Sequence, residues 1–297
     1  LYQMEKGLYM GLNSIEFHMR FQSDEDCLEY LSELKWSDNL YTCRKCGCDR
    51  YCKGRTQFSR RCIKCGYDES VTAYTAFEKC KFSLLVAFHI VFKTSTKVKG
   101  MSSRELSNEF DLRQKTCWSF KRKVQQCMTS SRNHKIVGQV HIDEFYIGQY
   151  EENKIGRSTD GKKKLVIVAL EILDDGVGRA YARIIENASS KEFRPFFEDY
   201  ISNEARIVTD QWRGYLPLKK DYPFLTQIPS NKGSNFKELH LHIMNIQGWL
   251  RGIHHHCSKE HLQGYLDEYH FRFNRRNNMD TIFDMLLRRM ICQKKTD

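Results

Sequence analysis

The sequence predicts an α/β protein in which a mixed central sheet with helices follows a small metal-bound module and a helical segment. Three patterns predict this order. Two CxxC pairs lie near the N-terminus, helical stretches follow them, and strand-like runs mixed with helices begin at residue 139. The chain has 297 residues, enough for one large domain with smaller modules before it. We expect three segments, at residues 1–80, 81–135 and 136–297.

Charge and composition narrow the class of protein. Lys and Arg total 48 against 37 acidic residues, which gives a formal net charge of +11. Clustered cations bind polyanions such as nucleic acid by displacing counterions, although the same charge also serves solubility. The sequence has no apolar run long enough to span a bilayer and no secretory pattern at its start. We therefore expect a cytoplasmic protein without a membrane partner, in which the cysteines stay reduced.

The cysteine spacing predicts a structural zinc site. Two CxxC pairs are separated by fifteen residues: Cys43, Cys46, Cys62 and Cys65. This is the spacing of a zinc ribbon, in which two knuckles place four thiolates around one Zn²⁺ ion. Four protein ligands leave no coordination position for catalysis, and redox or disulfide use is the less favoured alternative. Cys48 and Cys52, between the pairs, are expected to be spare thiols.

Residues 81–135 are expected to form a helix-turn-helix-like segment. An apolar helix over 81–98 precedes a second helix capped at Ser102 or Ser103, and a third follows after a short break. The third helix, over about 113–128, carries five basic residues: Arg113, Lys115, Lys121, Arg122 and Lys123. A basic second helix of such a pair is typical of DNA contact, whereas the alternative is a helical hairpin with a solvated basic face. The basic residues of the ribbon allow the same two interpretations.

From residue 139 the pattern changes to strands rich in β-branched and aromatic residues. Five strands are predicted, at residues 139–148, 165–173, 178–186, 205–210 and 222–229. The first three are linked as hairpins, and a helix that begins near Ser189 or Ser190 precedes the fourth. Three hairpin-linked strands, a helix and a strand give the order of the RNase H-like fold. In that fold the first and fourth strands are neighbours at the centre of the sheet.

This strand order would bring two carboxylates together. Asp143 lies in the middle of the first strand, and Asp210 ends the fourth. Two close carboxylates repel each other unless a cation lies between them, and Mg²⁺ or Mn²⁺ suits oxygen ligands. Taken singly, each acid has a plainer interpretation, as a strand-end or turn residue. Taken together on this strand order, they predict a two-metal phosphodiester site.

Glu144 follows Asp143 directly within the first strand, in VHIDEFYIG. Successive side chains of a strand point to opposite faces, so only one of the two acids can reach the site directly. Asp is the shorter side chain and holds a metal closer to the backbone. We therefore assign Asp143 as the metal ligand and Glu144 as a supporting or surface group.

Together these motifs resemble bacterial insertion-sequence transposases of the ISXO2-like class, DDE-type enzymes with an RNase H-like core and an N-terminal zinc ribbon. The resemblance spans about residues 28–291. It rests on the ribbon, the helix-turn-helix-like segment, VHIDEFYIG, IVTDQWRGY and the tail WLRGIHHHCSKEHLQGYLDEYHFRFNRR. It implies Mg²⁺-dependent cutting of element ends and their joining to target DNA. The implied partners are double-stranded DNA, both terminal inverted repeats and target, and further copies of the chain in the DNA complex.

The third position of the catalytic set departs from the usual pattern, whereas the resemblance matches Asp143 and Asp210 to the first two. In DDE enzymes it is normally a Glu on a helix after the last strand. Here that helix starts near Lys237, and Glu238 is its only acid and lies very early. Members of this class often use Asn or His instead. We therefore expect Asn245 to complete the metal site, with His242 as the second choice.

A basic residue one or two turns after the third position accompanies the set in this class, and Arg251 fills that place. The resemblance implies that it contacts a phosphate near the cut. Because the third Glu is missing, one alternative is a catalytically inactive or domesticated DNA-binding protein with an RNase H-like core. A structure-selective nuclease of the same fold is a further alternative.

Overall fold

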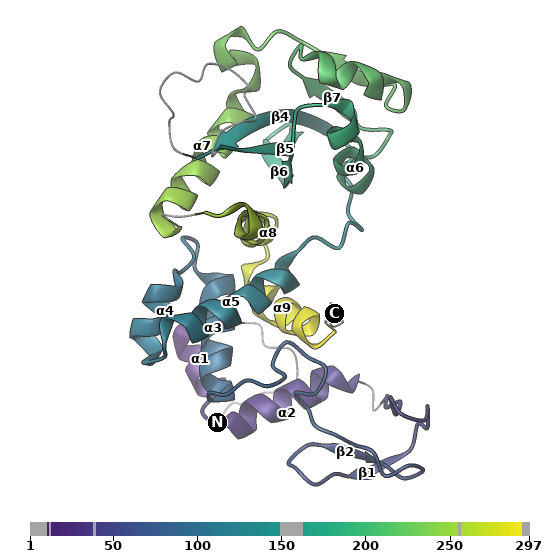
Figure 1. The fold of residues 1–297 in the computed structure, drawn as a ribbon, viewed down its shortest axis with the longest axis vertical. Coiled ribbons are helices and arrows are strands. Elements are labelled where there is room, and N and C mark those ends of the chain that lie inside the picture. Colours follow the sequence, from purple (N-terminus) through teal and green to yellow (C-terminus); the bar gives the residue numbers. More distant parts are fainter. Residues whose placement is uncertain (1–10, 12, 38–39, 149–162, 255–256, 293–297) are drawn as a thin grey trace. The chain divides into compact units, whose positions relative to one another are not determined.

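The computed structural model describes residues 11, 13–37, 40–148, 163–254 and 257–292 (Figure 1). The chain divides into two compact units, one of residues 1–128 with 277–297 and the other of residues 129–276. Each unit is described by itself. Within the described ranges, no helix is both long enough and apolar enough to cross a membrane.

The first unit is mainly helical. Its helices are α1 (Ser14–Arg20), α2 (Asp24–Lys35), α3 (Leu84–Thr96), α4 (Ser103–Phe110), α5 (Gln114–Met128) and α9 (Ile282–Ile291), the last preceded by the 3₁₀ helix η4 (Met279–Thr281). Ser23 and Ser102 begin α2 and α4 with capping boxes, which satisfy backbone N–H groups that the first turn leaves unpaired. The sequence predicted α3, α4 and α5, whereas α1, α2 and α9 are additional.

Aromatic side chains from several helices form the core of this unit. The ring centroid of Phe283 in α9 lies 5.5 Å from that of Phe17 in α1 and 5.9 Å from that of Phe88 in α3, both edge-on. The buried hydroxyl of Tyr30 in α2 donates a 2.5 Å hydrogen bond to Asp284 of α9. The last helix of the chain therefore completes the core of the N-terminal helices.

A small antiparallel sheet lies between α2 and α3 in the sequence. Its strands are β1 (Tyr51–Lys53), β2 (Arg60–Cys62) and β3 (Asp68–Glu69), in that order. The buried carboxylate of Glu69 forms an ion pair with Lys35 of α2 at 2.8 Å. Lys35 also donates to two backbone carbonyls that follow β3. These bonds satisfy a buried charge pair and attach the small sheet to α2.

The second unit contains a five-stranded sheet in the order β6-β5-β4-β7-β8. Its strands are β4 (Gln139–Ile147), β5 (Lys164–Leu173), β6 (Gly176–Ile185), β7 (Arg206–Thr209) and β8 (Leu225–Gln227). The first three are antiparallel, whereas β7 pairs in parallel with β4, and β8 pairs in parallel with β7. The RNase H-like order predicted from the sequence is confirmed, with the first and fourth strands adjacent. Most of the segment between β4 and β5, residues 149–162, lies outside the described residues.

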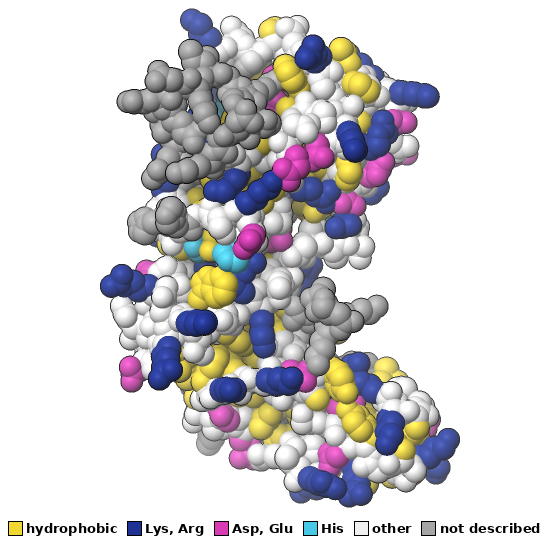
Figure 2. Space-filling view, viewed as in Figure 1, with side chains coloured by type: hydrophobic (Ala, Val, Ile, Leu, Met, Phe, Trp, Pro, Cys, Tyr) yellow, Lys and Arg dark blue, Asp and Glu magenta, His cyan; other side chains and the backbone are white. Residues whose placement is uncertain are grey.

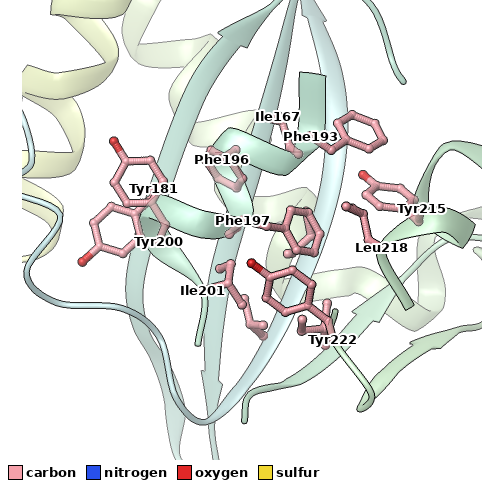
Figure 3. Close-up of a cluster of buried hydrophobic side chains, with 14 of the residues drawn as sticks. Ile167, Tyr181, Phe193, Phe196, Phe197, Tyr200, Ile201, Tyr215, Leu218 and Tyr222 are labelled. Atoms are coloured by element: carbon pink, nitrogen blue, oxygen red, sulfur yellow. The ribbon is translucent and has the colours of Figure 1, made fainter. Parts of the chain in front are cut away.

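Helices cover both faces of this sheet. On one face are α6 (Ser190–Tyr200) and the 3₁₀ helix η2 (Arg213–Lys220). On the other are α7 (Lys237–Ile253), which follows the 3₁₀ helix η3 (Asn231–Phe236), and α8 (Lys259–Phe273). The α6 face is rich in aromatic side chains, and Phe193 stacks on Tyr215 with centroids 4.5 Å apart (Figure 3).

The residues of β4 alternate between these two cores. Val140 and Ile142 belong to the core under α6, whereas Phe145 belongs to the core under α7. This alternation follows from the two-residue period of a strand. It places Asp143 on the α7 face and Glu144 on the α6 face.

Candidate functional site

Two carboxylates meet where β4 and β7 separate. The parallel pairing of these strands ends with Ile142 opposite Thr209. Asp143 and Asp210 are the next residue on each strand. Because the strands run in the same direction, the two acids follow the last pair side by side. The predicted meeting of two acids from distant parts of the sequence therefore follows from the strand pairing.

The electrostatics of Asp143 depend on its neighbour. Burial raises the pKa of Asp143, and the negative charge of Asp210 raises it further. Two groups lower the pKa of Asp143. The backbone N–H of Glu144 donates to Asp143 Oδ1 at 2.8 Å, and the His240 imidazole lies beside the carboxylate. A divalent cation would neutralise this repulsion, and carboxylate oxygens are ligands that Mg²⁺ and Mn²⁺ prefer. The acids present thus fit a divalent metal ion.

A hydrogen-bonded turn holds the backbone that follows Asp210. The backbone N–H of Trp212 donates to Asp210 Oδ1 at 3.0 Å, and the Trp212 indole N–H donates to the carbonyl of Ala188 at 2.7 Å. The side-chain amide of Gln227 donates to the carbonyls of Asp210 and Trp212, at 3.0 and 2.9 Å. The turn is therefore fixed by the Asp210 carboxylate within it and by the Gln227 side chain of β8.

Glu144 points away from Asp143 and has a different partner. Its Oε2 accepts a 2.8 Å hydrogen bond from the hydroxyl of Tyr215, a fully buried residue of η2. Burial raises the pKa of Tyr215, and the charge of Glu144 raises it further, so the phenol remains a donor. This bond ties the strand that carries Asp143 to the segment that follows Asp210.

Helix α7 presents His240 to Asp143. The His240 Nε2 lies 3.3 Å from Asp143 Oδ2. Gly233 makes room for the imidazole, because a Cβ built on this glycine would lie 2.5 Å from His240 Nδ1. Gly233 also has a φ of +92°, which favours glycine. The sequence interpretation missed His240. The clue available to it was helical phase, since the neighbouring apolar residues Leu239 and Ile243 are both buried.

The two residues that the sequence favoured for the third position lie elsewhere on α7. His242 is buried, and its Nε2 lies 3.2 Å from the Nε2 of His270 in α8. Asn245 is exposed. Residues three apart on a helix differ by about 60° in direction, which here separates a buried side chain from an exposed one. Arg251, further along, is also exposed. The proposed metal and phosphate contacts of these residues stay predictions.

His254, directly after α7, is half-buried. Its ring stacks on Tyr265 of α8 with centroids 3.7 Å apart and an interplanar angle of 13°, and it meets Trp249 edge-on at 5.1 Å. The physical reason is that α8 folds back against the end of α7. His255 and His256 fall outside the described residues.

The four ribbon cysteines come together as predicted. Their sulfur atoms all lie within 4.8 Å of one another, as a tetrahedral zinc site requires: Cys43, Cys46, Cys62 and Cys65. Gly47 and Gly66, one residue after each CxxC pair, both have a φ of +70°. The four thiols therefore fit a structural zinc ion. Across the described residues, no other group of three or more metal-ligating side chains gathers in this way. Cys48 and Cys52 stay outside the cluster.

The basic residues of the α5 segment do not all face solvent. Lys121 is buried, and its ammonium group donates a hydrogen bond to the carbonyl of Met101 at 2.6 Å. Lys123 donates to two backbone carbonyls of the segment before α3, at 3.3 and 3.2 Å. Arg113 and Lys115, at the start of the helix, are exposed. Long basic side chains can thus serve packing, which periodicity does not reveal.

Two family models match the chain. Residues 135–274 match the ISXO2-like transposase domain, and residues 22–68 match the transposase zinc-ribbon domain. No curated protein matches significantly. Among solved structures, one described as the crystal structure of a pre-cleavage Mos1 transpososome aligns with a TM-score of 0.30 and 12% sequence identity. That alignment covers 67% of this chain and 76% of the other.

Proposed function

The chain belongs to the ISXO2-like transposases with an N-terminal zinc ribbon, and on that premise we propose that it cuts the ends of an insertion sequence and joins them to target DNA. The observation that carries this proposal is the placement of Asp143, on β4, beside Asp210, directly after β7. In this proposal the two acids hold Mg²⁺ or Mn²⁺. The proposal also includes a homo-oligomer of this chain bound to DNA.

The proposed chemistry is phosphodiester cleavage followed by strand transfer. Bound divalent ions would supply positive charge that activates the attacking hydroxyl and stabilises the leaving oxygen. In cleavage, a water oxygen attacks phosphorus, the bond from phosphorus to the 3′-oxygen breaks, and that oxygen takes up a proton. In strand transfer, the freed 3′-hydroxyl attacks a phosphorus of target DNA and displaces a target 3′-oxygen. Asp143 and Asp210 act by holding the ions, and Arg251 is proposed to contact a phosphate near the cut.

Two residues of α7 are candidates for the third position. Asn245 is proposed from the family resemblance, and its exposure leaves its amide oxygen accessible to an ion held with DNA. His240 is supported by its 3.3 Å contact with Asp143. An imidazole is also an established metal ligand and a common partner of a ligating carboxylate. The two assignments predict different mutational effects, which are compared below.

We further propose that the start of α5 contacts double-stranded DNA. Gln114, Lys115 and Ser119 are exposed on successive turns, and α5 contains no acidic residue. The Gln114 amide donates to Ser103 Oγ of α4 at 3.3 Å, which links the two helices of the pair. Amide and hydroxyl groups can read base edges, whereas a Lys ammonium binds phosphate. Figure 2 shows further Lys and Arg side chains on the ribbon, where Arg50 and Lys53 are exposed.

A strand-joining assay tests the proposed reaction. Purified protein is incubated with a duplex that carries the element's terminal repeats, with target DNA and Mg²⁺. Asp143→Asn and Asp210→Asn should each abolish cleavage and joining while DNA binding persists. Asp175→Asn, in the exposed turn between β5 and β6, is the matched control and should behave as wild type. Joining at wild-type rates by either of the first two variants would remove the assignment.

The same assay separates the alternatives. DNA binding by the wild-type protein without Mg²⁺-dependent cleavage would support an inactive or domesticated DNA-binding protein. Cleavage that does not depend on the terminal repeats would instead support a structure-selective nuclease.

A further inference from the structure

We propose that Gln227 is a positioning residue that fixes the direction of the Asp210 carboxylate, an inference that rests on the proposed metal-dependent reaction. Gln227 is the last residue of β8 and lies opposite Thr209 in the parallel β7–β8 pair. From this place its side chain reaches the turn that begins at Asp210. Gln227 was not a candidate in the sequence, because nothing in TQIP distinguishes it from an ordinary strand-end residue.

Asp210 needs such support because it lies one residue beyond β7. The sheet pairing on both sides stops at Thr209, which faces Ile142 on β4 and Gln227 on β8. Within a strand, the backbone bonds to both neighbours fix the direction of a side chain. Past the end of the strand, the turn that follows fixes it instead. A displacement of about 1 Å at a reacting centre can cost roughly 100-fold in rate, so the geometry of this turn matters.

The Gln227 amide controls this geometry through two backbone carbonyls. An amide NH₂ group has two donor hydrogens, and the carbonyls of Asp210 and Trp212 both accept from it, at 3.0 and 2.9 Å. The peptide group that follows Asp210 and the one that follows Trp212 are thereby held to one point. In this conformation the Trp212 N–H donates to Asp210 Oδ1 at 3.0 Å, which sets the rotation of the carboxylate. Gln227 therefore acts on the carboxylate through the turn.

The neighbouring residue of β8 provides a matched control. Thr226 Oγ1 donates to the carbonyl of Ile207 at 3.1 Å, so it also bonds to β7 but well before the Asp210 turn. Gln227→Met removes both donor hydrogens with little change in side-chain length, and Thr226→Val removes one hydroxyl from the same strand. If Gln227 only stabilised the fold, the two variants would affect the reaction in the same way.

Kinetics of joining give the first test. For Gln227→Met, we expect kcat to fall about 10- to 100-fold, the range seen when groups that orient metal ligands are removed. The KM for DNA should stay unchanged, and the Mg²⁺ concentration for half-maximal rate should rise. Thr226→Val should stay within about twofold of wild type in kcat, in the KM for DNA and in the Mg²⁺ concentration for half-maximal rate. Wild-type kcat and Mg²⁺ dependence in Gln227→Met would overturn the proposal.

Two further readouts do not depend on catalysis. Hydrogen exchange at the Trp212 amide, which donates to Asp210, should become faster in Gln227→Met and remain slow in Thr226→Val. The rise in melting temperature on adding Mn²⁺ should also become smaller. If the wild-type protein joins no DNA, the proposed function fails, but these readouts still decide the role of Gln227. Should Gln227→Met not fold, the shorter amide of Gln227→Asn should give intermediate exchange, and wild-type exchange in that variant would overturn the role.

Discussion

The zinc ribbon and the carboxylate site are both metal-site geometries, but they are assembled differently. The four ribbon cysteines come from one short stretch, Cys43 to Cys65, and two local knuckles bring them together. Asp143 and Asp210 come from distant parts of the sequence and meet because β4 and β7 pair in parallel. Local spacing therefore determines the first site, and topology determines the second.

The two sites also differ in the amount of apolar core that holds them in place. The ribbon has three strands of two or three residues each, too little to bury a core of its own. The carboxylates stand on a sheet covered by apolar side chains on both faces. A metal ion should therefore be required to fold the ribbon, whereas the sheet should fold without one. The predictions below test this contrast, beginning with the largest expected effect.

Loss of zinc should unfold the ribbon and leave the sheet intact. Cys62→Ser removes a buried ligand, and zinc binding by small folds supplies on the order of 10 kcal/mol of folding free energy. We expect the variant to lose its zinc, measured by metal analysis, and ribbon amides to exchange rapidly. Amides of β4 and β5 should remain protected. Cys52→Ser, at an exposed residue of β1, is the control and should keep one zinc per chain. Full zinc content in Cys62→Ser would contradict the ligand assignment.

Acid should weaken the helices that cover the carboxylate site. Burial lowers the pKa of His242 to about 3 and that of His270 to about 4, below the usual value of about 6.5. The nearby charge of Arg276 lowers that of His242 further. Both imidazole rings are therefore neutral in the folded protein, whereas in the unfolded protein they become protonated below about pH 6.5. The contribution of these two histidines to the free energy of unfolding is fully present above about pH 6.5 and is lost as pH falls toward 4. The loss is on the order of several kcal/mol.

Hydrogen exchange in α8, followed from pH 7 to 4, measures this loss, with rates corrected for the intrinsic effect of pH. The double variant His242→Leu with His270→Leu should lose most of the dependence, because its buried side chains no longer titrate. His134→Gln, at an exposed histidine of the same unit, should retain it. An unchanged dependence in the double variant would place its origin elsewhere.

Sequence reasoning succeeded where a residue's position depends on spacing or strand order. It predicted the clustering of the four cysteines, the strand order and the meeting of the two acids. It did not find His240, because a choice among residues of one helix depends on its rotation, and each residue changes that direction by about 100°. It also did not find Gln227, whose role depends on two backbone carbonyls of a turn. Backbone partners leave no pattern in a sequence.

Substitutions in α7 can decide which residue completes the carboxylate site. If His240 acts there, His240→Ala should slow joining about 100-fold, or roughly 3 kcal/mol, as expected for loss of a group that orients a metal ligand. Asn245→Ala should then have a much smaller effect, because the Asn245 side chain is exposed and lies more than one helical turn after His240. The opposite ranking would favour Asn245. Gly248→Ala, in open space on the same helix, is the control for changes in α7 itself.

The smallest expected effect concerns the two kinds of lysine in α5. Lys115→Ala should weaken DNA binding by less than about 1 kcal/mol and lower the dependence of binding on salt by about one ion, because one phosphate contact is lost. Its melting temperature should not change, since the side chain is exposed. Lys121→Met should do the reverse. It leaves the Met101 carbonyl without its donor, which costs about 1–3 kcal/mol of stability, and it should leave the salt dependence unaltered.

Binding measured from low to moderate salt, together with thermal melts, separates these two outcomes. An equal fall in salt dependence for both variants would show that Lys121 also contacts DNA. A fall for Lys115→Ala alone would confine DNA contact to the first turns of α5. Lysine residues of one helix would then divide between exposed positions that bind phosphate and buried positions that bond to the protein's own backbone.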